Sequence, residues 1–109
     1  MTDTYAATIY QDNYNENETN NKSLKKMYKS IRKWKGKAFY IYFDNSNKKL
    51  AKQEAKKFIK QFNFKGKYKV FFDDEKDVFT GVPFSEAIFL VKEKDFNDIF
   101  MMASLIYGK

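Results

Sequence analysis

Two short aromatic-rich runs on either side of one amphipathic run constrain the fold of this chain more than any other feature. Residues Ala38–Phe43 and Tyr68–Phe72 are rich in Tyr and Phe, which favour pleated strands. Between them, apolar residues recur at helical spacing over Lys49–Phe62. Because strands joined through a helix are usually parallel neighbours, we predict that these two strands are adjacent and parallel.

Four further segments complete the predicted order of elements. Ser23–Trp34 has one apolar stripe and predicts an amphipathic helix, and Asp95–Tyr107 predicts a second one at the end of the chain. Ala87–Val91 is apolar at every position and predicts a buried strand, while Thr4–Tyr10 could add a short edge strand. The predicted fold class is α+β: a single two-layer α/β sandwich with helices on one face of a small mixed sheet. It contains a parallel βαβ unit, and a ferredoxin-like arrangement is the nearest common template.

Charge is unevenly distributed along the 109 residues, whose net charge is +7. Residues 1–21 contain four acidic and no basic residues, so they are predicted to be an acidic polar segment, either loose or an edge strand. Residues 22–72 contain 17 basic residues against two acidic ones. We therefore expect residues 22–109 to form a single basic α+β domain.

The composition excludes several classes of enzyme. The chain has no Cys and no His, which rules out thiol nucleophiles, cysteine–zinc sites and histidine-based catalytic triads. No cofactor is expected, and we predict that the protein is not an enzyme. The polar N-terminus does not resemble a signal peptide, and no apolar run is long enough to span a bilayer. We therefore expect a protein of the cytoplasm without membrane contact, in a host cytoplasm if its origin is viral.

The lysine-rich helix faces are the main candidate for function. Basic surfaces attract nucleic acids through their phosphates, and lysine provides charge without the bidentate geometry that reads bases. Tyr40 and Tyr42 share one face of a predicted strand and could stack on bases. The predicted nucleic-acid-binding residues are Lys25, Lys26, Lys29, Arg32, Lys33, Lys49, Lys52, Lys56, Lys60, Tyr40 and Tyr42.

Three carboxylates provide an alternative. Asp44, Asp73 and Asp74 end the two predicted parallel strands, and carboxylates gathered there could bind Mg²⁺. Acidic residues at strand ends are more often simple turn formers, so these three are weak metal candidates.

The last helix has apolar residues outside its core stripe. Met101, Met102 and Leu105 lie beside or opposite that stripe, so either the first helix or a partner must cover them. We expect a protein interface at these residues, with a homodimer as its simplest form.

These observations favour a small non-enzymatic protein that contacts nucleic acid or a ribonucleoprotein without sequence specificity. A second hypothesis is a phage or mobile-element protein that inhibits a host or defence factor through protein–protein contact, because Lys, Asn, Tyr, Phe and Ile all have AT-rich codons and are abundant here. Its contact surface would be the last helix or the acidic turn after residue 72. A small metal-dependent nuclease is the third.

Overall fold

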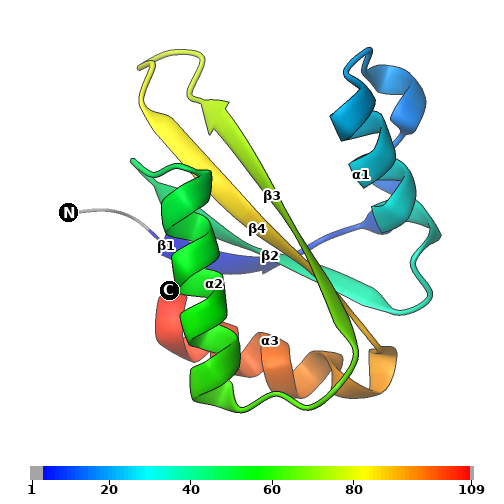
Figure 1. The fold of residues 1–109 in the computed structure, drawn as a ribbon, viewed down its shortest axis with the longest axis vertical. Helices are drawn as coiled ribbons and strands as arrows, with labels where there is room; N and C mark the ends of the chain where they lie inside the picture. Colours follow the sequence, from blue (N-terminus) through cyan, green and yellow to red (C-terminus); the bar gives the residue numbers. More distant parts are fainter. Residues whose placement is uncertain (1–3, 109) are drawn as a thin grey trace.

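The computed structural model describes residues 4–108 as one antiparallel sheet with helices on both faces (Figure 1). The predicted helices and strands all form. The strand that begins at Tyr68 continues to Lys76, through the segment predicted as an acidic turn, and the strand after residue 82 is also longer than expected. In chain order the elements are β1 (Thr4–Thr8), the 3₁₀ turns η1 (Gln11–Asn13) and η2 (Glu16–Glu18), α1 (Lys22–Lys33), β2 (Lys37–Asp44), α2 (Lys48–Phe62), β3 (Tyr68–Lys76), β4 (Pro83–Val91) and α3 (Glu93–Tyr107).

The strand order β1-β2-β4-β3 corrects the predicted pairing. β4 is antiparallel to both β2 and β3, so these two strands run in the same direction but are not neighbours. The adjacent parallel pair and the mixed sheet are therefore wrong predictions, although α2 does connect the two strands. The physical reason is that β4 forms a hairpin with β3 and is apolar on both faces, which favours the centre of the sheet. The connection is a split βαβ unit.

The prediction of two layers is also wrong. Alternation along β2 directs Phe39 and Ile41 toward α2 and α3, while Ala38 packs with Met27 and Ile31 of α1 on the opposite face. Figure 1 shows α1 apart from the other two helices. The ferredoxin-like arrangement is not confirmed, because the strand beside β2 precedes it in the chain instead of following α3.

Asparagine side chains fix where two of the helices begin. The Asn21 side chain accepts hydrogen bonds from the backbone N–H groups of Ser23 and Leu24, and Asn47 accepts one from Leu50. Each bond satisfies a helix N–H that has no partner within the helix. Local sequence signals therefore determine where α1 and α2 begin.

Candidate nucleic-acid interface

Five lysines from separate segments surround the single tryptophan at one end of the sheet. Lys29 and Lys33 come from the last turns of α1, Lys35 from the following connection, Lys69 from the start of β3 and Lys92 from the residue after β4. They line a cavity of about 440 Å³ together with Ser30 and Trp34. We call these five side chains the lysine rim. They meet because β3 begins beside the point where β4 ends, with Tyr68 opposite Val91.

Trp34 is fixed in position by contacts on several sides. Its indole N–H donates a 2.8 Å hydrogen bond to the carbonyl of Val91, and the Lys92 ammonium lies 5.2 Å from the indole ring centre. Gly36 allows this close approach, because a Cβ there would lie 2.2 Å from the Val91 oxygen. The Gln11 amide donates to the carbonyls of Ile31 and Trp34. The partly exposed indole is therefore held in place before any ligand binds.

Among the residues that the structure describes, no carboxylate forms an ion pair with a lysine of the rim. Across residues 4–108, the one ion pair between side chains joins Arg32 to Glu16. A second cavity of about 540 Å³ extends the basic surface with Lys65, Lys67 and Lys94, and it shares Lys92 with the first. Glu93 and Asp95 also line that second cavity, at more than ion-pair distance from its lysines. The uncompensated charge therefore produces a local positive potential around Trp34.

The predicted basic residues do not form one surface. The lysines of α1 lie on one side of the sheet, whereas Lys49, Lys52, Lys56 and Lys60 belong to α2 on the other side. Lys25 and Lys26 are exposed on α1, and Arg32 is bound by Glu16. Lys35, Lys69 and Lys92 were not among the predicted nucleic-acid-binding residues. The β3–β4 pairing was the signal that could have found Lys69 and Lys92, because it brings both residues to the same end of the sheet.

Tyr40 and Tyr42 lie in acidic surroundings. Tyr42 stacks on Tyr5 with ring centres 4.9 Å apart, and its hydroxyl lies 3.4 Å from an Asp44 carboxylate oxygen. Glu86 is directly opposite Tyr42 on the neighbouring strand. We call the surface formed by Asp73, Glu75, Glu86, Tyr5 and Tyr42 the acidic sheet face. Its negative charge disfavours a phosphate backbone, so this face is a poor place for the base stacking predicted for the tyrosines.

Burial and mutual repulsion change the proton affinity of this acidic cluster. Asp73 and Glu86 are opposite each other across β3 and β4. Burial, reinforced by the charge of Asp73, raises the pKa of Glu86 to about 7. Burial, with Glu75 as the next cause, raises the pKa of Asp73 to about 6. Burial also raises the pKa of Tyr14, which packs beside α1, to about 12.

The weak metal candidates do not come together. Asp44 ends β2, whereas Asp73 and Asp74 lie within β3, and β4 separates the two strands. As consecutive strand residues, Asp73 and Asp74 point to opposite faces of the sheet. Over the residues that the structure describes, no group of three or more acidic side chains is arranged to hold a metal ion.

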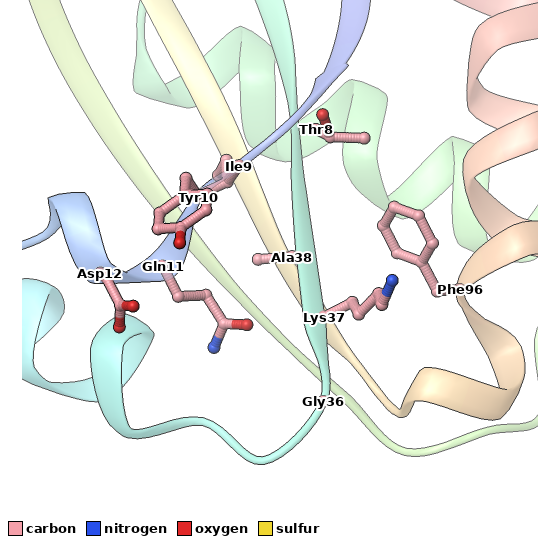
Figure 2. Close-up of a pocket in the computed structure, with 9 residues that line it drawn as sticks. All are labelled: Thr8, Ile9, Tyr10, Gln11, Asp12, Gly36, Lys37, Ala38 and Phe96. Carbon is pink, nitrogen blue, oxygen red and sulfur yellow. The ribbon is translucent and has the colours of Figure 1, made fainter.

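A separate cavity of about 440 Å³ lies where β1 ends, between the N-terminal turns and the start of β2 (Figure 2). Its one lysine, Lys37, directs its amine toward Phe96, 5.5 Å from the ring centre. The Gln11 amide N–H groups are used by the end of α1. Lys37 and the Gln11 amide therefore already have partners within the protein, and the other polar residues of the lining are Thr8, Tyr10 and Asp12.

The apolar residues predicted for an interface differ in exposure. Met101 and Leu105 are 62% and 75% exposed, whereas Met102 is half-buried against the core formed by the sheet, α2 and α3. α1 lies on the other face of the sheet and does not cover them. Their role as an interface stays a prediction.

No family model, curated protein or solved structure matches this chain. Among the helices within residues 4–108, none has the length and apolar character needed to cross a membrane.

Proposed function

We propose that this protein binds nucleic acid at the lysine rim, using Trp34 as a stacking platform. The observation that supports this most is the convergence of five unpaired lysines on one immobilised, partly exposed indole. Lysines neutralise phosphates without reading bases, and base–aromatic stacking contributes about 1–3 kcal/mol per base. Stacking requires an unpaired base, so the preferred ligand is a single strand, bound without sequence preference.

The decisive experiment uses Trp34 as its own reporter. Because the chain has one Trp, its fluorescence reports on the rim alone. A single-stranded oligonucleotide of mixed sequence is expected to quench that fluorescence, and the affinity is expected to fall steeply with salt. The same strand within a duplex should bind more weakly.

Two matched variants locate the site. Lys29→Gln/Lys33→Gln removes two charges from the rim, and Lys49→Gln/Lys60→Gln removes two exposed charges from α2 on the opposite face. The rim variant is expected to lose about tenfold in affinity and to reduce the slope of log affinity against log salt by roughly 1.4, since each phosphate contact on a single strand contributes about 0.7. The α2 variant should change little. An equal loss in both variants would mean that only overall charge matters.

A protein partner is the second candidate function, and the β3–β4 connection favours it. Val78 and Phe79 at its tip are 87% and 94% exposed. The Asp77 carboxylate accepts hydrogen bonds from the backbone N–H groups of Phe79 and Thr80, which fixes the loop that presents them. An ordered apolar tip suits a groove on another protein, including a host factor that this chain would inhibit. Phe79→Ser should abolish capture of such a partner while leaving oligonucleotide binding unchanged.

A further inference from the structure

The outer edge of β3 is unusually long and regular for an unpaired strand. β3 spans nine residues and pairs with β4 without a break from Tyr68 to Lys76. Within residues 4–108, no strand pairs with its other side. Natural edge strands are usually short, or interrupted by proline or a bulge, because unpaired backbone groups invite pairing with another chain. β3 has neither interruption, and the charged side chains that can also protect an edge are arranged here so that they complement a second copy.

The charge pattern of β3 is complementary to that of a second β3 strand running in the opposite direction. Lys67 and Lys69 stand at the beginning of β3 or just before it, and Asp73 and Glu75 stand toward its end. In an antiparallel pairing of two copies, the basic half of each strand lies against the acidic half of the other. We propose that a second copy of this chain pairs with β3 along its free edge, joining two four-stranded sheets into one.

The side chains select one register. A two-fold axis perpendicular to the sheet keeps each side chain on the same face of the sheet in both copies. Opposite residues of an antiparallel pair share a face, and side chains alternate between faces along a strand, so the two-fold axis must pass through a residue and not between two residues. Centred on Phe71, Lys69 lies opposite Asp73 of the second copy, Lys67 opposite Glu75, and Val70 opposite Phe72. Shifting the centre to Val70 sets Lys69 against Phe71, and shifting it to Phe72 sets Asp73 against Phe71. The register centred on Phe71 is the one that sets Lys69 opposite a carboxylate and Val70 opposite an apolar residue at the same time.

The surface beside the free edge of β3 also favours pairing with a second copy of the chain. Val70 and Phe72 are partly exposed and line an apolar cavity of about 390 Å³ with Ile59 of α2. The second copy's Val70 and Phe72 would continue this apolar surface across the new junction. On the other face, its Lys69 would bring a cation to Asp73, for which the structure gives no ion-pair partner among the described residues. Opposite residues in such a pair have Cβ atoms about 5 Å apart, within reach of a salt bridge.

Charge exchange tests the proposal. Light scattering of the wild type is expected to give roughly twice the 13.0 kDa of one chain. Lys69→Asp alone and Asp73→Lys alone each set like charges opposite one another, and each should be monomeric. A mixture of these two variants restores both opposite-charge pairs and should form a heterodimer. The double variant Lys69→Asp/Asp73→Lys restores them in a homodimer.

Three results would overturn the proposal. The first is a wild type that stays monomeric at every concentration, with β3 amides whose hydrogen exchange does not slow as concentration rises. The second is a dimer that survives both single exchanges. The third is a dimer lost in Met101→Glu/Leu105→Glu but not in the β3 variants, which would assign the interface to α3. Circular dichroism of each variant establishes that it is folded, and the measured quantity is mass rather than oligonucleotide binding. The result is therefore independent of the proposed function.

Discussion

The lysine rim and the acidic sheet face lie on the same side of one sheet, but they differ in the sign of their charges and in how far those charges are buried. Lys69 and Asp73 are four residues apart on β3, about 13 Å along the strand. The rim holds exposed cations from several segments around an ordered indole. The acidic face instead brings two half-buried carboxylates together, and both of their pKa values are raised. Repulsion between exposed lysines costs little in water, whereas buried carboxylates oppose folding at neutral pH.

The largest expected effect comes from a substitution that disrupts the support of Trp34 in the lysine rim. Gly36→Ala should destabilise the protein by about 3 kcal/mol, because the new Cβ would meet the Val91 carbonyl at 2.2 Å and disrupt the Trp34 hydrogen bond. Urea unfolding followed by Trp34 fluorescence measures it. The matched control, Gly81→Ala, lies beyond the acidic face and has no atom within 4 Å of a new Cβ. Its positive φ of 73° should cost only about 1 kcal/mol. Equal losses would contradict the special role of the Gly36 contact.

The next effect concerns the acidic face and depends on pH. A folded-state pKa near 7, against 4.5 as the ordinary value, means that the folded protein holds the Glu86 proton more tightly than the unfolded chain. The resulting stability is fully present below about pH 4.5 and is lost as the pH rises toward 7. Glu86→Gln should remove this loss and stabilise the protein at pH 8 by about 1 kcal/mol, a value reduced by solvent screening at this partly exposed site.

The pKa of Asp77 is shifted in the opposite direction to that of Glu86, so its effect on stability has the opposite pH dependence. Backbone N–H groups of Thr80 and Phe79 lower the pKa of its carboxyl below 3.8. Its contribution is therefore present above that pH and lost as the pH falls further. Asp77→Asn should therefore lower stability above pH 3.8, and its stability–pH curve, measured by urea unfolding, should converge with that of the wild type as the pH falls below that value. Asp73, with a pKa of about 6, contributes its own loss at lower pH. A Glu86→Gln curve that falls between pH 6 and 7 as steeply as that of the wild type would therefore show that Glu86 is not the source of the loss in that range.

The smallest effect tests the boundary between the two regions. Glu16→Gln weakens its partly exposed ion pair with Arg32, which should cost about 0.5 kcal/mol of stability. The same change leaves Arg32 without its counter-charge beside the α1 lysines. Oligonucleotide binding should then tighten two- to threefold and depend more strongly on salt. Unchanged binding in a salt titration would mean that the rim ligand does not reach Arg32.

The sequence was sufficient for the elements but not for their arrangement. Periodicity predicted α1, α2, α3 and the aromatic strands, because each signal is local to one segment. Strand order depends on which strand occupies the centre, and the apolar run Ala87–Val91 already carried that information. We assigned the central pairing to the two aromatic runs instead, since a helix joins them. The hairpin between β3 and β4 overrides that connection, because its strands meet across six residues, 77–82.

The wrong strand pairing also prevented part of the candidate site from being predicted. Lys29 and Lys33 follow from helical spacing, so they could be predicted. Lys69 and Lys92 are far apart in the chain and meet only because β3 begins where β4 ends. Trp34 is the last residue of the predicted amphipathic helix. In the structure it packs against the core beside α1, and its partly exposed indole also lines the cavity of the rim. No local pattern distinguishes a buried indole from one that lines a cavity.

The central position of β4 also determines when the sheet can form during synthesis. β2 and β3 are both made before the strand that joins them, and neither pairs with the other. Until residue 91 has left the ribosome, β3 has no partner strand and β2 has only β1. Translation adds about 5–20 residues per second, so a nascent chain spends seconds with aromatic strands unpaired. Chaperone binding in that interval should therefore favour the Ala38–Phe43 and Tyr68–Phe72 segments. Rapid closure of the β3–β4 hairpin around Gly81 would shorten the interval.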